Sequence, residues 1–333
     1  MLDDFKTFLE AMQRLSSLAP EIELRRQEIV HDLARSKAAQ VPTRLFHYTS
    51  LQGACGILQS NNLWATDFRF LYDTNELVYG ARILVEELQR FGDKHGGDVS
   101  NFLQKLALFY REHGDSYRQF FETYIISFSQ NPDILSQWLA YAGNASGHCI
   151  EFDISDSRLF TIVDARTPWA MEISAVIYEE KVQRELIGRG IVRLVAYLNA
   201  TEWPITRIVS APELEQYVVL GFLIHMFEPF VTSFKHIDFS EEREWRAVVS
   251  CARNLTQEHR KEIIQGSNAR PYIECIFIQG DEIDLWQREL LPIKGIIHGP
   301  LAEGGPIAKL EATITEEGYK DLIGCKRSAL SLK

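Results

Sequence analysis

Apolar residues recur at helical spacing from the start of the chain and predict two helices before residue 40. The positions that share this spacing are Phe5, Phe8, Leu9, Met12, Leu15 and Leu18, then Ile22, Ile29, Val30, Leu33 and Ala34. Pro20 separates the two runs, because proline ends a helix. We expect a helical pair over residues 1–40 that braces the rest of the chain or offers a docking surface to a regulatory partner.

A main domain over residues 41–333 begins after Pro42 with a strand, a helix and a second strand. The short apolar run that delivers His47, Tyr48 and Thr49 predicts the first strand. An amphipathic helix and a second short strand follow it directly. Polar side chains at the point where a strand meets a helix N-terminus suit a ligand, because the N–H groups there favour anions.

A strand over residues 123–129 carries the second polar group. Ser127 and Ser129 share one of its faces, because side chains alternate along a strand. A short helix over Leu135–Ala142 follows and places Gln137, Trp138 and Tyr141 close to the end of that strand. Helices and strands are mixed across the main domain without regular alternation, which indicates an α+β fold rather than a doubly wound sheet.

The third polar group is a run of acidic and basic residues late in the chain. Interpreted as a strand, this run directs Glu242, Glu244 and Arg246 to one side and continues into an apolar segment. Two carboxylates on one face should raise the pKa of one of them, which suits a general base.

Composition and charge narrow the class of protein and its partners. The chain has 333 residues, of which 46% are hydrophobic and 24% charged, as in an ordinary globular protein. Its formal charge of −11 argues against non-specific binding to duplex nucleic acid, which relies on neutralising many phosphates. The longest apolar run, Tyr217–Phe227, is too short to span a bilayer, and the first residues lack the basic start of a signal peptide. We expect a soluble, cytoplasmic protein with no membrane partner.

Common metal, nucleotide and nucleophile motifs are missing from the sequence. Without CxxC or HExxH spacing no metal is expected, and no GxGxxG, GxxxxGK[ST] or GxSxG motif is found. Five cysteines and nine histidines leave a Cys–His nucleophile open, although no local signature supports one.

Each of the three polar groups also has a purely structural interpretation. A His beside a Tyr is often a satisfied pair, alternating serines often line a solvated strand face, and an acidic-basic run is typical of a surface strand with ion pairs. Their order along the chain, His-Tyr-Thr, then Ser-x-Ser, then Glu-x-Glu, is more specific than any one of them.

That order resembles the three-part signature of the ADP-ribosyltransferase superfamily. The run "LFHYTSLQGACGILQSNNLWAT" is similar to the first motif of the DNA-targeting ADP-ribosyltransferase toxins and of the His-Tyr-Glu class. Over roughly residues 44–333, "FHYTS", "SFSQNPDILSQWLAYAGNASGHCIEFD" and "KHIDFSEEREWR" resemble an uncharacterised bacterial family often encountered near toxin and phage-defence genes. The resemblance implies a split β-sandwich with a cleft and surrounding helices.

The resemblance also implies an enzyme that breaks the glycosidic bond of NAD, its substrate. Glu244 would be the catalytic carboxylate near the ribose 2′-hydroxyl, and Glu242 would position or deprotonate the acceptor. His47 would hydrogen-bond a ribose hydroxyl or the carboxamide. The remaining expected NAD-binding residues are Tyr48, Thr49, Tyr72, Ser127, Ser129 and Trp138. One of the aromatic residues would stack on nicotinamide, while the serines would support the cleft and position the acid.

Two departures from the family pattern leave alternatives open. Because Tyr48 is adjacent to His47, either the first strand ends at His47 or another aromatic, Tyr72 or Trp138, takes the stacking role. A helical insert near residues 155–231 has no counterpart in the minimal fold and could shape acceptor specificity.

The function implied by the resemblance is transfer of ADP-ribose by a toxin or phage-defence effector. Net acidity favours a protein acceptor, whereas similarity to DNA-targeting toxins favours single-stranded nucleic acid, which aromatic stacking could hold. NAD hydrolysis, with water as acceptor, is the close alternative. A non-catalytic module that senses a nucleotide or a phage component is another. An antitoxin would be a natural partner for the N-terminal helices.

Overall fold

A computed structural model describes the chain over residues 24–29, 42–71, 75–117, 121–155, 157–164, 167–201, 203–252, 259–265, 268–279, 290–320 and 323–331. The chain divides into two compact units. The helical unit takes residues 1–38, 72–121 and 177–239, and the sheet unit takes residues 39–71, 122–176 and 240–333. Of the predicted N-terminal helical pair, only residues 24–29 lie within the described ranges, and they are helical.

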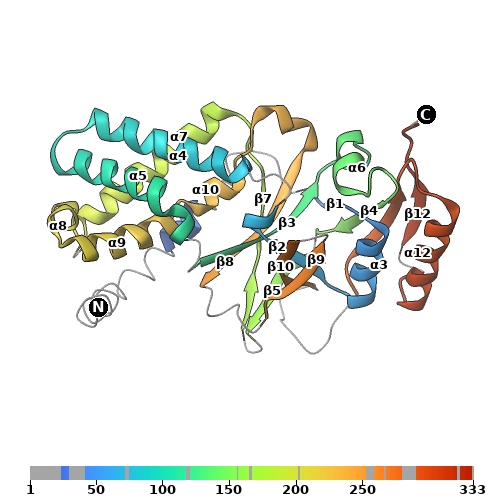
Figure 1. The fold of residues 1–333 in the computed structure, drawn as a ribbon. Coiled ribbons are helices and arrows are strands. Elements are labelled where there is room, and N and C mark those ends of the chain that lie inside the picture. Colours follow the sequence, from blue (N-terminus) through green and yellow to red (C-terminus); the bar gives the residue numbers. More distant parts are fainter. Residues whose placement is uncertain are drawn as a thin grey trace. The chain divides into compact units, whose positions relative to one another are not determined.

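Helices of the helical unit pack on one another through two long antiparallel members, α4 and α5 (Figure 1). The helices are α4 (Asn75–Lys94), α5 (Gly97–Tyr117), α7 (Glu180–Asn199), α8 (Ile205–Ser210), α9 (Glu213–His225) and α10 (Glu228–Ser233). α4 contacts α7 and α10, while α5 contacts α8 and α9. Gly80 permits the α4–α10 contact, because a Cβ there would lie 2.7 Å from the Val231 carbonyl oxygen.

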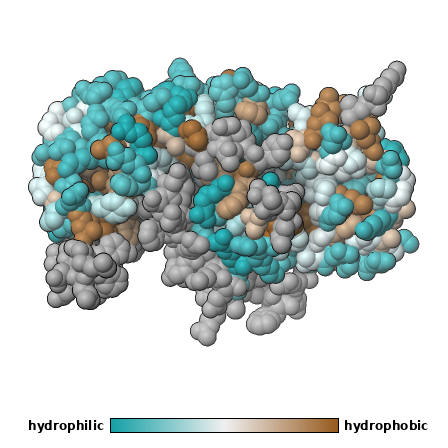
Figure 2. Space-filling model, in the orientation of Figure 1, coloured by the Kyte–Doolittle hydropathy of each residue, from teal (hydrophilic) through white to brown (hydrophobic). Residues whose placement is uncertain are grey.

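The segment Glu213–Ser233 is apolar enough to cross a membrane by length and composition. However, 72% of it is buried inside the protein, as in a core helix of a soluble protein, and it is divided into α9 and α10. On the face drawn in Figure 2, hydrophobic residues are scattered among hydrophilic ones.

The helical unit is built from three segments, whereas the sequence indicated one helical insert near residues 155–231. The first part of that range forms strands: β5 (Ser157–Asp164), β6 (Thr167–Ala170) and β7 (Glu172–Ala175). β5 is rich in Phe, Thr, Ile and Val, the residue types that favour strands, and it pairs with both β6 and β10.

All the described strands join in one hydrogen-bonded sheet. The other strands are β1 (Arg44–Thr49), β2 (Leu63–Asp67), β3 (Phe121–Ser129), β4 (His148–Asp153), β8 (Glu244–Ala252), β9 (Lys261–Gln265), β10 (Asn268–Gln279), β11 (Ile293–His298) and β12 (Gly324–Arg327). The order is β12-β11-β4-β1-β3-β2-β10-β5-β6, with β8 paired to β3 and β7, and β9 paired to β10. β11 and β12 pair in parallel, and the other registers seen among these strands are antiparallel. The predicted α+β class is therefore confirmed.

Within the described residues, three helices and two 3-10 helices complete the sheet unit. They are α3 (Leu51–Ser60), α6 (Leu135–Tyr141), α12 (Gly304–Glu316), η1 (Phe68–Phe70) and η2 (Ile237–Glu242), the last at the boundary between the units. Ser50 directly follows β1 and caps α3, since its Oγ accepts a hydrogen bond of 3.1 Å from the Gly53 N–H. The predicted strand–helix–strand unit at the start of the main domain is confirmed.

β3 has three partner strands, although a strand has only two edges. β8 pairs along the length of β3. At one end, the Gln130 N–H donates a backbone hydrogen bond of 2.9 Å to the Arg243 carbonyl oxygen. At the other end, the hydroxyls of Thr123 and Ser250 lie 2.8 Å apart. β8 therefore occupies one whole edge of β3.

β1 and β2 must then share the other edge of β3. β1 pairs with it at Phe46–Ser129, near the C-terminal end of β3, and β2 pairs at Thr66–Ile125, nearer the start. Because the two strands meet β3 at different heights, they diverge from each other and the sheet splits between them.

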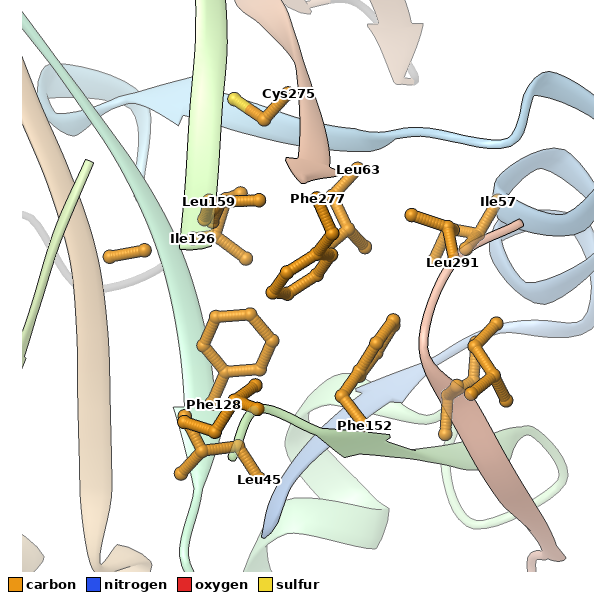
Figure 3. Close-up of a cluster of buried hydrophobic side chains, with 14 of the residues drawn as sticks. Leu45, Ile57, Leu63, Ile126, Phe128, Phe152, Leu159, Cys275, Phe277 and Leu291 are labelled. Atoms are coloured by element: carbon orange, nitrogen blue, oxygen red, sulfur yellow. The ribbon is translucent and has the colours of Figure 1, made fainter. Parts of the chain in front are cut away.

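The split sheet closes over an apolar core that joins strands distant in the sequence (Figure 3). Phe152 on β4 stacks on Phe277 of β10 with ring centroids 5.6 Å apart, and Phe128 on β3 meets Phe152 edge-on at 5.9 Å. Each buried aromatic contributes roughly 1.5–3 kcal/mol through the area it removes from water. This core holds β1 and β3 in place and so fixes the backbone around their polar residues.

Candidate functional site

A pocket of about 60 Å³ in the sheet unit lies where the three polar groups meet. It is lined by Phe46, His47, Tyr48, Ser127, Phe128, Ser129, Gln137, Tyr141, Glu242 and Glu244. These side chains come from β1, β3, α6, the end of η2 and the start of β8. The structure thus brings together six residues singled out in the sequence, His47, Tyr48, Ser127, Ser129, Glu242 and Glu244.

His47 stands at the point where β1 leaves β3. Its Nδ1 donates a hydrogen bond of 2.9 Å to the Ser127 carbonyl oxygen, beyond the last paired residues of the two strands, Phe46 and Ser129. Burial lowers the pKa of His47 below its ordinary value of 6.5, so the ring is neutral at pH 7. Since Nδ1 carries the proton, Nε2 is left as a hydrogen-bond acceptor.

Ser129 connects the end of β3 to the acidic run. Its Oγ donates to the Glu242 carbonyl oxygen at 2.8 Å and accepts from the Asn131 N–H at 3.1 Å. With 1% of its surface exposed, Ser129 does not belong to a solvated face. Ser127 is partly exposed at the pocket, and its backbone carbonyl, rather than its hydroxyl, holds His47.

The acidic run is not one continuous strand, so the prediction of a shared strand face for Glu242 and Glu244 is wrong. Glu242 ends η2, Arg243 adopts a left-handed φ of 47°, and β8 begins only at Glu244. The left-handed residue breaks the extended backbone that alternation assumes. The alternative of a surface strand is also wrong for the acids, because Glu242 and Glu244 are only 8% and 7% exposed.

Glu244 forms a bidentate ion pair with Arg246 on the same face of β8. Arg246 Nε donates to Glu244 Oε1 at 2.7 Å, and Nη2 donates to Oε2 at 3.0 Å. Arg246 is only 1% exposed, and its guanidinium carbon lies 6.0 Å from the Phe68 ring centre. The fork fixes the plane of the carboxylate and places a positive charge beside it.

Tyr48 and Trp138 hold the turn before α6. β1 continues to Thr49, and the Tyr48 hydroxyl donates to the Asn131 carbonyl at 3.1 Å and accepts from the Ile134 N–H at 3.0 Å. The Trp138 ring lies edge-on to Tyr48 at 4.9 Å and is fully buried. Trp138 therefore offers no ring face to a ligand in this conformation.

The remaining expected NAD-binding residues lie elsewhere. Thr49 ends β1 outside the pocket lining, and Tyr72 lies outside the described residues. Gln137 and Tyr141 of α6 do reach the pocket. The sequence placed both near the end of β3, although it indicated a binding role only for Trp138 on this helix.

Cys149 does not support a Cys–His nucleophile. It lies on β4, is fully buried, and its pKa is raised well above the usual value, chiefly by burial. A protonated, enclosed thiol is a poor nucleophile. Across the described ranges, no three His, Cys, Asp or Glu side chains are grouped so as to hold a metal ion.

Residues 137–247 match the family model described as "Protein of unknown function (DUF2971)". The matched segment is about a third of the chain; it includes Gln137, Tyr141 and the Glu242–Arg246 run, but not His47 or Ser127. No curated protein and no solved structure matches the chain.

Proposed function

We propose that this chain is an ADP-ribosyltransferase that consumes NAD, and that its sheet unit is an ADP-ribosyltransferase-like split β-sandwich. The observation that carries the proposal is the convergence of His47, Ser127 and Glu244 on one pocket from three distant segments. The divergence of β1 and β2 along β3 supports the split-sheet part, because it opens the sheet beside His47.

The pocket residues suit cleavage of the bond between ribose C1′ and the nicotinamide nitrogen. Nicotinamide leaves with the electron pair of that bond, and positive charge develops on the ribose. The Glu244 carboxylate, oriented by Arg246, stabilises this charge, since a fixed dipole or charge is most effective where charge develops. The neutral His47 accepts a hydrogen bond at Nε2 from a ribose hydroxyl.

The acceptor completes the reaction opposite the leaving group. A lone pair of the acceptor forms the new bond to C1′, and its proton passes to Glu242, which lines the same pocket. One NAD and one acceptor give ADP-ribosylated acceptor, nicotinamide and a proton. A protein or a single-stranded nucleic acid is the proposed acceptor, and water would give NAD hydrolysis.

Substrate entry requires the pocket to widen. Its volume of about 60 Å³ is well below the roughly 300–1,000 Å³ of sites for small molecules. Tyr141, the last residue of α6, lines the pocket and is 36% exposed, whereas Trp138 is fully buried and anchors the helix. We therefore assign Tyr141 to the mouth of the site.

The direct test is nicotinamide release from NAD by the full chain, with radiolabelled NAD to reveal a modified acceptor. Glu244→Gln should lower the rate by about 10²–10³-fold, the usual loss of one key electrostatic group. Glu241→Gln, an exposed neighbour outside the pocket lining, is the matched control and should leave the rate unchanged.

The outcomes separate the alternatives. No nicotinamide release with protein, single-stranded nucleic acid or water as acceptor would overturn the enzymatic proposal. Release without labelled macromolecule would assign NAD hydrolysis, and NAD binding without release would assign a sensing module. As a toxin or phage-defence effector, the chain should arrest growth of a bacterial host on expression, and Glu244→Gln should relieve the arrest.

A further inference from the structure

An open groove of about 870 Å³ runs between α4 and α7 within the helical unit. It is lined by Arg90, Phe91, Glu180, Lys181, Arg184, Glu185, Gly188, Arg189, Val192 and Arg193. Cationic side chains outnumber carboxylates among these residues, although the chain as a whole has a formal charge of −11. A local positive surface on an acidic protein concentrates anions where it lies.

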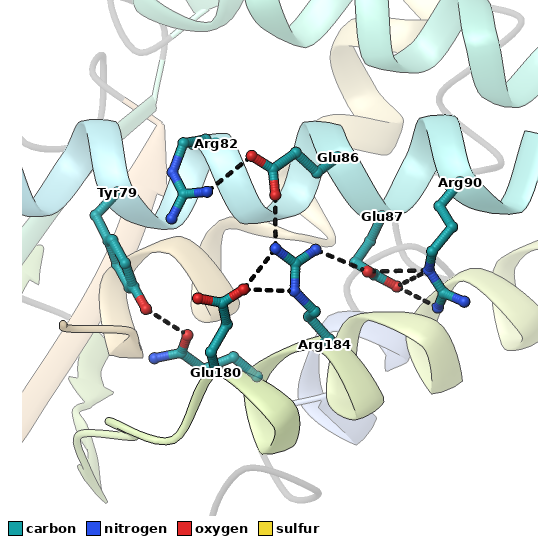
Figure 4. Close-up of polar contacts among 8 residues, drawn as sticks. Tyr79, Arg82, Glu86, Glu87, Arg90, Glu180 and Arg184 are labelled. Atoms are coloured by element: carbon teal, nitrogen blue, oxygen red, sulfur yellow. Dashed lines mark hydrogen bonds and ion pairs between the residues drawn. The ribbon is translucent and has the colours of Figure 1, made fainter. Parts of the chain in front are cut away.

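Two of the cations are committed to structure (Figure 4). Arg184 donates to Glu86 at 2.6 Å, to Glu87 at 3.0 Å and to Glu180 at 2.6 Å. Arg90 pairs with the fully buried Glu87. These ion pairs fasten α4 to α7 and form a rigid wall, so they are not the groups that a ligand would engage.

Two other cations are available. Lys181 and Arg189 are exposed on α7 and make no ion pair with any other residue of the described ranges. Glu185 lies between them at a spacing of four residues, yet it pairs with neither. Arg193, one further turn along, also lines the groove but is already engaged in a contact of its own.

The floor of the groove is apolar. A Cβ on Gly188 would lie 3.1 Å from Cζ of Phe91, so the glycine lets the aromatic ring approach α7 closely. Val192 beside it is 58% exposed and adds apolar surface to the groove. A ligand in the groove can therefore make apolar contacts and charged ones.

We propose that this groove binds a nucleotide. Arg189 and Lys181 would hold its phosphates, because a guanidinium fork matches phosphate oxygens and an ammonium adds a point charge. Phe91 and Val192 would pack against the nucleoside. The volume falls within the range typical of small-molecule sites.

ATP binding to the full chain, measured by calorimetry at low and physiological salt, tests the proposal. We expect saturable binding that weakens as salt increases. Arg189→Glu should weaken it at least about tenfold, as the loss of one charge-assisted hydrogen bond predicts. Arg111→Glu, which reverses the charge of an exposed arginine on α5 outside the groove, is the matched control and should bind as the native chain. Thermal melts of both variants verify folding.

Further arms identify the ligand class. Pyrophosphate should compete with ATP more weakly than ADP does, since it lacks the nucleoside. Absence of saturable ATP binding, or an Arg189→Glu chain that binds ATP as the native one does, would overturn the proposal. A single-stranded oligonucleotide that binds through Arg189 while ATP does not would also overturn it. Because Glu244→Gln should leave ATP binding intact, failure of the NAD reaction and failure of this site are distinguishable.

Discussion

The Arg246 guanidinium holds both carboxylate oxygens of Glu244 from two positions further along the same strand. Both side chains are more than nine-tenths buried, so their ion pair replaces charge and hydrogen bonds that water would otherwise supply. Burying two charges costs several kcal/mol, and apolar residues would stabilise the strand at least as well. The pair is better explained by the fixed orientation that it gives the carboxylate at the pocket.

Removal of one partner should therefore destabilise the protein more than removal of both. Arg246→Met leaves the Glu244 carboxylate buried without the bidentate guanidinium contact, so the free energy of unfolding should fall by about 3–5 kcal/mol. The double variant Glu244→Met/Arg246→Met should recover a substantial part of that loss. Urea denaturation of the two single variants and the double variant measures the coupling, and strictly additive losses would contradict it.

The two serines of β3 should respond differently to alanine. Ser129→Ala removes the hydrogen bonds to Glu242 and Asn131 from a buried site and should lower the free energy of unfolding by about 1–3 kcal/mol. Ser127→Ala should change stability by less than about 0.5 kcal/mol, because the backbone carbonyl of residue 127 holds His47. Equal losses in denaturant melts would show that the Ser129 contacts are unimportant.

Glycine should be tolerated at position 243. Arg243 occupies a left-handed conformation, with φ of 47°, which costs an L-residue about 1 kcal/mol that glycine does not bear. Arg243→Gly should leave the melting temperature unchanged or raise it, while Arg243→Val, a β-branched residue, should lower it by several degrees. A stabilised valine variant would indicate that the backbone at this position is extended in solution.

Acid should destabilise the sheet unit through a buried histidine pair. His148 on β4 and His298 on β11 face each other with Nδ1 atoms 3.1 Å apart, and neither Nε2 has a partner among the described residues. One Nδ1–H must donate to the other nitrogen, so the accepting ring is neutral, and a proton on its Nδ1 would place two N–H groups against each other.

The sign of the pH dependence follows from the lowered pKa of each ring. Burial lowers the pKa of His148 to about 4. Burial also lowers the pKa of His298; the nearby Glu311 carboxylate raises it, and the Arg327 guanidinium lowers it further. The unfolded chain therefore binds more protons than the folded one below pH 6.5. The contribution of His148 to the free energy of unfolding is fully present above pH 6.5. It falls by about 3 kcal/mol as the pH drops to about 4.

Urea melts between pH 7 and pH 4 measure this loss. His148→Leu should flatten the pH dependence, whereas His95→Leu, at an exposed histidine of α4's C-terminal end, should leave it as in the native chain. A His148→Leu chain with an undiminished acid loss would place the responsible groups elsewhere.

Hydrophobic periodicity predicted much of the sheet unit around the site. The strand that carries His47, the helix after it and the strand that carries Ser127 all follow from apolar spacing. The same spacing predicted the α+β class. The turn at Arg243 was missed because arginine has no intrinsic preference for a left-handed backbone, and only the surrounding contacts impose it.

The roles of the aromatic residues were harder to predict. Periodicity says which face of an element a residue occupies, but not whether another element covers that face. Trp138 is covered and Tyr141, three residues later, is open, and this difference depends on long-range packing of α6 against β1. Arg246 was correctly placed beside Glu244, yet its burial depends on the rest of the sheet.

The division of the chain into its two units has a topological consequence. The polypeptide passes between the units at residues 38–39, 71–72, 121–122, 176–177 and 239–240. A single backbone cut leaves each unit still tied to the other, so a nicked chain should remain one particle under native conditions. The sheet unit must also recruit strands from all three of its segments before its pocket exists, which makes its folding dependent on closing long loops and thus slow.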